Sequence, residues 1–247
     1  MRPWRPPELP AVGGATPAIA LPAGALQEEH IRWEPCYRLI ASEFAGENLF
    51  DRLVDEADLL KRQQQLEAAQ QIADLTNPLV QDRLGEIELV PMADRIYGPG
   101  TGLIMSAFTF PTAPSRFCNG EFGTYYAAGD RETAIAELRY HAANSLRGSA
   151  PCVVEKTVVE ALLDATLVDV RAGRPSPPGT YDPDDYATGQ ALGAVVRRLE
   201  GYGIVYDSVR RPSGECAAIF RPRALANAQA VQTLLFDWNG EEIVSVR

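Results

Sequence analysis

The sequence predicts a mixed fold of the α/β (α+β) class, because two kinds of pattern recur along one chain. Short runs rich in β-branched and aromatic residues are typical of strands. Longer runs with apolar residues at helical spacing are typical of helices that pack one face against a sheet. Strand-like runs occupy residues 31–40, 124–128, 204–206 and 217–220, and helical registers occupy residues 49–75, 132–146 and 190–199.

The first 27 residues are set apart by their composition. Arg2 and Arg5 precede an uncharged run at 9–26, an outline that a secretory signal also has. Prolines and glycines interrupt this run, which makes it poor material for the continuous apolar helix of a signal. We therefore expect residues 1–27 to form a disordered arm and residues 28–247 to form a single domain. Whether the arm is a processed segment stays open.

The domain is expected to begin with a strand near Ile31 and to continue into a helical stretch. Between Leu49 and Leu75 apolar residues recur at helical spacing, while charged and amide side chains cover the other faces. Pro78 follows closely and would stop such a helix. The pattern predicts a helical insert at about residues 44–76, most simply a packing element or a surface for a partner.

Three glycines near the start of the segment IYGPGTGLIMSAFTF, residues 96–110, invite comparison with a dinucleotide-binding loop. The comparison fails, because the spacing departs from GxGxxG and no clear strand leads into the glycines. A loop followed by a short buried helix is the better prediction. The GxxxxGK[ST] phosphate loop is also absent from the sequence.

A short strand at residues 124–128 leads into the helix at 132–146. Glu137 lies beside the apolar face of this helix, where a carboxylate needs a charged or hydrogen-bonding partner. An ion pair with Arg116 or Arg139 is the simplest structural explanation. From spacing alone, that explanation stays open beside a catalytic role for Glu137.

The second half of the chain alternates between strand-like and turn-forming segments. Residues 151–170 contain two strand-like runs around a short helical or turn stretch, and residues 174–186 form a loop rich in proline, glycine and aspartate. The predicted strands at 204–206 and 217–220 are joined by a polar turn. Ser208 lies at the start of that turn, where serine is usually a turn former.

Composition excludes several classes of protein. The 247 residues carry a net charge of −10 and contain no block of lysine or arginine, so direct binding to nucleic acid is not expected. The two histidines are His30 and His141, and the 4 cysteines are scattered without CxxC spacing. We therefore expect reduced thiols and no metal site. The isolated cysteines favour a cytoplasmic protein. After the N-terminal arm, no apolar run approaches the roughly 20 residues that span a bilayer, so binding to a membrane is not expected.

Taken together, several segments resemble the RES domain family, which is named for an arginine, a glutamate and a serine. The likeness extends over most of the chain after the arm, and the order and spacing of its segments are more specific than any one motif. The predicted helical insert is a departure, because the shortest members of the family lack it. The matching segments are CYRL with Arg38, SRFCNGEFGTYYAA with Arg116 and Tyr126, TAIAEL with Glu137, and GIVYDSVRRPSGEC with Ser208.

The resemblance implies a fold like that of the ADP-ribosyltransferases, with mixed sheets surrounded by helices. It also implies an NAD-consuming toxin of a bacterial toxin–antitoxin pair, acting as an NAD phosphorylase, an NAD glycohydrolase or an ADP-ribosyltransferase. The acceptor of ADP-ribose, whether phosphate, water or a protein, stays open, as does any protein target. The implied partner is an Xre-type helix-turn-helix antitoxin, in a possible hetero-oligomer whose composition the sequence does not give.

The catalytic residues implied are Glu137, Arg116 and Tyr126. Departure of nicotinamide leaves positive charge on the ribose, which one carboxylate near the ribose hydroxyls can stabilise, and we assign this role to Glu137. Arg116 would neutralise the diphosphate of NAD through forked hydrogen bonds. Tyr126 would stack on the nicotinamide or on the ribose face.

The residues expected to bind NAD are Arg38, Tyr37, Tyr125 and Ser208. Arg38 would share the diphosphate with the second arginine. Tyr37 and Tyr125 accompany Arg38 and the tyrosine strand in the matching segments. Ser208 would hydrogen-bond the carboxamide or a phosphate oxygen. NAD is thus expected as the substrate, without a metal ion.

Two other functions compete with this one. The first is a RES-like interaction protein without turnover, whose acidic surface and predicted helical insert bind a partner repressor. Retention of the arginine, tyrosine and glutamate together argues against it, because a protein that only binds has little physical need of them. The second is a glycoside hydrolase, which is disfavoured because no second carboxylate accompanies Glu137.

Overall fold

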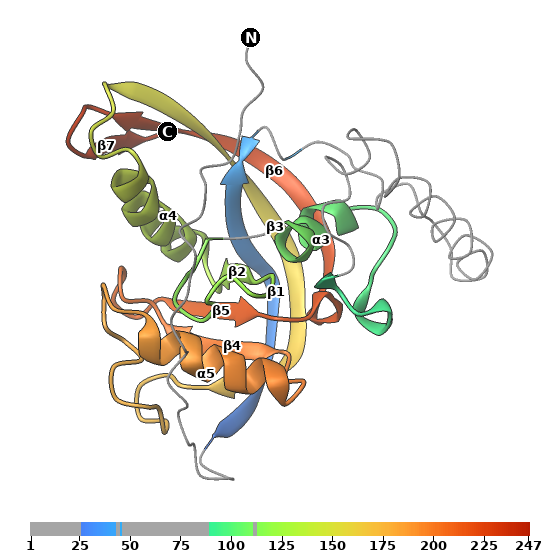
Figure 1. Ribbon diagram of the computed structural model, residues 1–247. Coiled ribbons are helices and arrows are strands. Elements are labelled where there is room, and N and C mark those ends of the chain that lie inside the picture. Colours follow the sequence, from blue (N-terminus) through green and yellow to red (C-terminus); the bar gives the residue numbers. More distant parts are fainter. Residues whose placement is uncertain (1–25, 43–44, 46–88, 111–112) are drawn as a thin grey trace, which may run out of the picture.

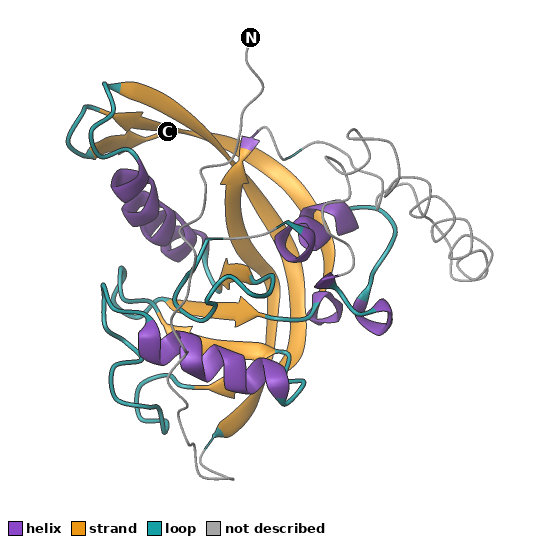
Figure 2. Ribbon diagram, in the orientation of Figure 1, coloured by secondary structure: helices purple, strands orange, loops and turns teal. Residues whose placement is uncertain are grey.

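The computed structural model describes residues 26–42, 45, 89–110 and 113–247. In this part of the chain the fold is of the predicted mixed α/β (α+β) class, with strands at the centre and helices around them (Figure 1, Figure 2). The strands are β1 (Gln27–Ala41), β2 (Tyr125–Ala128), β3 (Cys152–Asp169), β4 (Gly203–Asp207), β5 (Glu215–Ile219), β6 (Leu225–Trp238) and β7 (Ile243–Val246). The helices are α3 (Thr101–Thr109), α4 (Arg131–Ser145) and α5 (Ala187–Arg198), with 3-10 turns η4 (Met92–Asp94) and η5 (Pro222–Ala224).

Two predicted segments lie outside the described residues. These are residues 1–25 of the N-terminal arm and nearly all of the helical insert at 44–76. Both therefore stay predictions, and so does the single domain at 28–247.

The strands form one sheet that partly closes on itself. Its 7 strands follow the order β1-β2-β5-β4-β3-β6-β7, and β1 also pairs with β3. Strands β1, β2, β5, β4 and β3 thereby complete a ring, from which β6 and β7 extend. Strand β3 runs parallel to β4 and antiparallel to β1 and β6. The ring brings β1, from the start of the described chain, beside β2 and the helix that follows it.

Strand β3 corrects one sequence prediction. Two strand-like runs around a helical or turn stretch were expected at 151–170, whereas Cys152–Asp169 is one continuous strand. Alanine and leucine in the middle of this segment favour a helix locally. That preference is overridden because β3 pairs with β1 on one side and β6 on the other, so that Glu160 lies opposite both Tyr37 and Gln229.

Each main helix covers a different part of the sheet. Helix α4 packs Ile135 and Leu138 against a cluster that contains Phe236 and Trp238 of β6. Helix α5 packs on β4, and α3 packs on β6. Asp130 caps α4, because its Oδ1 accepts a hydrogen bond from the Thr133 amide at 2.9 Å. The predicted strands at 31–40, 124–128, 204–206 and 217–220, the short buried helix before residue 110, and the helices at 132–146 and 190–199 are confirmed.

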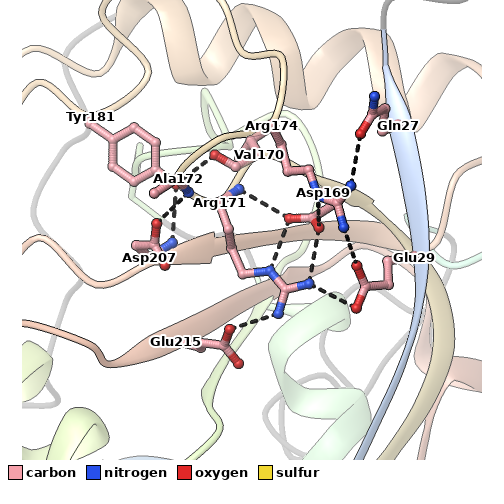
Figure 3. A network of polar contacts seen from close by, with 10 residues as sticks. All are labelled: Gln27, Glu29, Asp169, Val170, Arg171, Ala172, Arg174, Tyr181, Asp207 and Glu215. Atoms are coloured by element: carbon pink, nitrogen blue, oxygen red, sulfur yellow. Dashed lines mark hydrogen bonds and ion pairs between the residues drawn. The ribbon is translucent and has the colours of Figure 1, made fainter.

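A network of charges around the buried Asp169 carboxylate fixes the end of β3 (Figure 3). The Asp169 carboxylate accepts two hydrogen bonds from the Arg171 side chain, both at 2.9 Å, and one from Arg174 at 3.1 Å. The same arginines reach Glu215 of β5 and Glu29 of β1. Burial alone would raise the pKa of Asp169, but the hydrogen bonds and charge of Arg171 outweigh it and hold this pKa below its ordinary value. The network therefore joins three strands by ionised groups.

No described helix is both long enough and apolar enough to cross a membrane. All four cysteines lie in the described part of the chain and are free thiols, Cys152 exposed and the other three buried.

Candidate functional site

A pocket of about 310 Å³ opens between the ring of strands and helix α4. Its walls come from β1, the segment before β2, β2 itself, α4, the end of the loop before α5, and the strands β4 and β5 with the turn between them. Five of the seven residues that the sequence singled out line it, namely Tyr37, Arg38, Arg116, Tyr126 and Glu137. The fold thus gathers residues from 37 to 137 into one cavity.

Glu137 reaches the pocket from the middle of α4 and is half-buried. Its Oε1 accepts a hydrogen bond of 2.6 Å from the Ser208 hydroxyl and lies 3.9 Å from the Cys216 sulfur. Within the described chain it forms no ion pair with Arg116 or Arg139, whose side chains bind backbone carbonyls instead. The ion pair that the sequence suggested for Glu137 is therefore not formed, and the Glu137 carboxylate lines the pocket.

Ser208 follows β4 in the turn that leads to β5. Its hydroxyl donates to Glu137 and accepts the backbone amides of Arg210 at 3.1 Å and Arg211 at 3.0 Å. Ser208 does not line the pocket, unlike the residue it binds. The structure shows a contact of this serine with the Glu137 carboxylate, and its expected contact with a ligand stays a prediction.

Arg38 lies on β1 with its guanidinium 4.5 Å from the centre of the Tyr125 ring. Its Nη1 is buried and has no hydrogen-bond partner among the described residues. Burial lowers the pKa of Arg38, an effect that the neighbouring Tyr125 and Tyr126 oppose. Because arginine stays charged over the physiological range, the pocket wall holds a cation whose hydrogen-bonding capacity is partly unused.

The two tyrosines of β2 face opposite sides of the sheet, as successive residues of a strand must. Tyr126 lines the pocket, and its hydroxyl is bonded to the Ser115 hydroxyl at 2.8 Å and to the Phe117 amide at 3.0 Å. Burial raises the pKa of Tyr126, so its hydroxyl stays protonated at neutral pH. Tyr125 is fully buried and lies outside the pocket, where it supports Arg38. Its predicted direct contact with a ligand is not supported by this position.

Arg116 lines the pocket but is held by the loop that precedes α5. Its Nη1 donates to the carbonyl oxygens of Thr180 at 3.1 Å and Asp182 at 2.7 Å, and its guanidinium lies 4.7 Å from the centre of the Tyr186 ring. Glycine in α5 makes this position possible, because a Cβ at Gly189 would lie 2.3 Å from the Arg116 carbonyl oxygen. Arg116 therefore fixes the rim of the pocket through one of its terminal nitrogens.

Further residues of the pocket wall were missed by the sequence analysis. His141 lies four residues after Glu137, on the same side of a helix, and Arg210 lies two residues after Ser208. Either spacing could have pointed to them. Desolvation of the ring in the pocket wall lowers the pKa of His141, although the residue as a whole is exposed. The Glu137 carboxylate opposes this effect, and Arg210 and Arg116 lower the pKa further.

Tyr186, Tyr206 and Ser115 also line the pocket and were missed. Each belongs to a segment whose orientation depends on the closed ring of strands, so no local pattern reveals them. Tyr206 packs edge to face on Phe117, with 4.8 Å between the ring centres. These aromatic walls and the cations among them suit a ligand that has flat rings and negative charge.

The site therefore combines one oriented carboxylate, an unsatisfied guanidinium and aromatic surfaces. A carboxylate so placed can accept hydrogen bonds from sugar hydroxyls and stabilise positive charge that develops beside them. Within the described ranges, no group of three or more His, Cys, Asp or Glu side chains is arranged to hold a metal ion.

Comparison with known proteins agrees with the arrangement of these residues along the chain. The RES domain model matches residues 92–239, which include Arg116, Tyr126, Glu137 and Ser208. No curated protein matches the sequence significantly. Among solved structures, the chain is similar to the crystal structure of the M. tuberculosis MbcT-MbcA toxin-antitoxin complex, with 13% sequence identity, 85% of this chain and 87% of that chain covered, and a TM-score of 0.44. Because the RES model covers more than half of the sequence, this chain belongs to the RES domain family.

Proposed function

We propose that this protein is an NAD-consuming enzyme and the toxin of a bacterial toxin–antitoxin pair. It would break the bond between nicotinamide and ribose and transfer ADP-ribose to an acceptor. The observation that carries the proposal is the Glu137 carboxylate, held at 2.6 Å by Ser208, in the same pocket as the unsatisfied Arg38 guanidinium. Membership of the RES domain family supports it.

The chemistry asks little of the protein beyond binding and charge stabilisation. As the bond between the ribose carbon and the pyridine nitrogen breaks, its electron pair leaves with nicotinamide, which is already a cationic leaving group and needs no proton. Glu137 would hold the ribose hydroxyls and stabilise the positive charge that develops on the sugar. Arg38 would accept the diphosphate as the partner that it lacks.

The acceptor completes the reaction with an oxygen or another nucleophilic atom, which forms the new bond to the ribose carbon. Water or a protonated side chain then loses a proton, whereas an ionised phosphate oxygen has none to lose. Phosphate, water and a protein side chain are all consistent with the pocket. The proposed partner is an Xre-type antitoxin, and the net charge of −10 favours a partner with a basic surface. Location in the cytoplasm is part of the same proposal.

Incubating the purified protein with NAD, with and without phosphate, and identifying the products by mass spectrometry would test the function. Release of nicotinamide is expected. A phosphorylated ADP-ribose formed only with phosphate would identify phosphate as the acceptor, whereas release without dependence on phosphate would indicate water or a protein.

The Glu137→Gln variant is expected to fold normally and to lose about two to three orders of magnitude in NAD turnover, because a transition-state contact is removed. Glu132→Gln provides a matched control, since Glu132 is exposed on the same helix. If Glu137→Gln consumed NAD at the parental rate, the assignment would be wrong. If the parental protein consumed no NAD but bound a repressor, the interaction protein considered above would be the better reading.

A further inference from the structure

Arg210 lines the pocket, as Arg38 does, but lies in the turn between β4 and β5, far from Arg38 in the sequence. Its guanidinium carbon lies 3.3 Å from the centre of the Tyr140 ring on α4. Its Nη2 donates to the Pro183 carbonyl oxygen at 2.7 Å, and the Tyr140 hydroxyl donates to the Asp184 carboxylate at 3.0 Å. The side chain is therefore held on two sides before any ligand arrives, which lowers the entropy cost of binding one.

The hydrogen bonds of Arg210 are nevertheless incomplete. Its Nε is buried and has no partner among the described residues. In that part of the chain only four buried side-chain nitrogen or oxygen atoms lack a partner, and two of these are guanidinium nitrogens, one of Arg38 and one of Arg210. Both arginines line the same pocket. Buried donors without partners are costly, so their coincidence in one cavity points to a ligand that supplies acceptors to both.

The other arginines near the pocket do not share this property. Arg116 uses its Nη1 on two carbonyl oxygens of the loop, and Arg211 uses its Nη1 on Asp130 and Thr133 at the start of α4. Two cations, one on strand β1 and one in the turn between β4 and β5, each have an unused donor and together match a group that carries two adjacent negative charges.

We propose that Arg210 and Arg38, which line the same pocket, together bind a diphosphate. This inference rests on the proposed function, since the diphosphate of NAD is the group that would lie between them, and it adds Arg210 as a substrate-binding residue. It follows that the pocket selects ligands by the number of phosphates that they carry. Dinucleotides are expected to bind more tightly than nicotinamide mononucleotide, which has one phosphate, and much more tightly than nicotinamide riboside, which has none.

Calorimetry in a Glu137→Gln background, where NAD is not consumed, tests the role of Arg210 directly. The ligands are inorganic diphosphate, NAD and nicotinamide riboside. Adding Arg210→Gln is expected to weaken binding of diphosphate and of NAD by about tenfold or more, the loss typical of a charge-assisted contact, and to leave nicotinamide riboside within about threefold. Arg211→Gln removes the same charge from the same turn and is expected to leave diphosphate affinity within about threefold.

Diphosphate affinity that is unchanged by Arg210→Gln, or a parental protein that does not bind diphosphate, would overturn the inference. If Arg210→Gln does not fold, Arg210→Lys replaces it. Lysine keeps the charge but loses the fork and the ring stacking, so a loss of about threefold to tenfold is expected, and no loss overturns the inference.

NAD consumption by the parental protein is measured separately. Diphosphate binding that depends on Arg210, without NAD consumption, would retain the diphosphate site and reject the proposed function. If the protein consumes NAD but Arg210→Gln leaves diphosphate affinity unchanged, the role of Arg210 is rejected and the proposed function is retained.

Discussion

The Ser208 hydroxyl uses its donor and its acceptor capacity at once. It donates to the Glu137 carboxylate and accepts two backbone amides of its own turn. A hydroxyl with its only proton engaged at 2.6 Å has none left for a ligand. We therefore propose that Ser208 is a positioning residue, whose effect on the proposed reaction would pass through Glu137.

Ser208→Ala is expected to lower kcat for NAD about tenfold or more while changing KM little, because the Glu137 carboxylate loses the bond that orients it. Steady-state kinetics measure both constants. Ser208→Thr keeps a hydroxyl and is the matched control, with activity closer to the parent. A raised KM with unchanged kcat would instead favour the ligand contact that the sequence suggested.

At the residue scale, the sequence predicted which side chains lie near one another better than what each of them contacts. Arg38, Arg116, Tyr126 and Glu137 were named from the motif, and all four line the pocket. The hydrogen bonds from Arg116 to carbonyl oxygens of the loop at 174–186 could not be predicted, because the two segments are brought together only by the tertiary fold. For the same reason, no local pattern distinguished a residue that contacts a ligand from one that supports it.

At the scale of elements, helix α5 depends on two glycines for its closeness to the segment that carries Arg116. A Cβ added at Gly193 would lie 1.9 Å from the Phe117 carbonyl oxygen, and one at Gly189 would meet Arg116. These contacts are with backbone atoms, which cannot turn aside as a side chain can. The helix can approach only where side chains are absent.

Gly193→Ala is therefore expected to destabilise the fold by about 1–3 kcal/mol, as overpacking does, although alanine normally favours a helix. Chemical denaturation monitored by circular dichroism measures the change. Activity should fall as well, because displacement of α5 moves the segment that holds Arg116. Gly148→Ala is a useful comparison, since a Cβ there meets nothing within 4 Å and only the positive φ is strained. A more stable Gly193→Ala variant would contradict this view of the helix.

The end of β3 offers a second test at this scale, through pH. The pKa of Asp169 is held below its ordinary value, so its contribution to stability is present above the unfolded pKa of about 3.9 and is lost as pH falls through the folded pKa. Asp169→Asn should lower the free energy of unfolding at pH 7 by about 2 kcal/mol or more.

Thermal unfolding measured from pH 7 down to pH 3 follows that contribution. The difference between parent and Asp169→Asn should shrink as the pH approaches the folded pKa, because the parental carboxylate then becomes protonated. A difference that stays constant over this range would mean that the network does not depend on the charge of Asp169.

Elements with a strong local pattern were predictable, and those fixed by pairing were not. Helix α5 has clear helical periodicity and strands β4 and β5 have the composition typical of strands, and each was found. Strand β3 was divided in two because its alanine and leucine residues favour a helix, and β6 went unassigned because Asn227, Gln229 and Gln232 dilute its apolar pattern. Both are strands because each pairs with the other over most of its length.

At the scale of the whole molecule, the region matched by the RES model is shorter than the region that forms the fold and the pocket. The RES model begins at residue 92, whereas β1 lies before it and supplies Tyr37 and Arg38 to the pocket. Strand β1 pairs with β3 from Gln27 to Ala41 and closes the ring of strands. Residues before the matched region are therefore needed both for the fold and for the site.

A chain that lacks residues 1–41 is expected to lose cooperative unfolding, because β3 would expose one edge along most of its length. Urea titration followed by circular dichroism and by tryptophan fluorescence would reveal this, and coincident sharp transitions in the truncated chain would contradict it. A chain that starts at Leu26 keeps β1 complete and serves as the control.

The rim of the pocket is attached through main-chain oxygens. Arg116 and Arg210 grip the carbonyls of Thr180, Asp182 and Pro183, and every amino acid offers that same group. Side chains at positions 180, 182 and 183 can consequently be exchanged without removing these three hydrogen bonds, whereas Asp184 binds Tyr140 through its own carboxylate. Substitutions in this loop could therefore change which molecules bind at the rim while the residues that line the pocket stay the same.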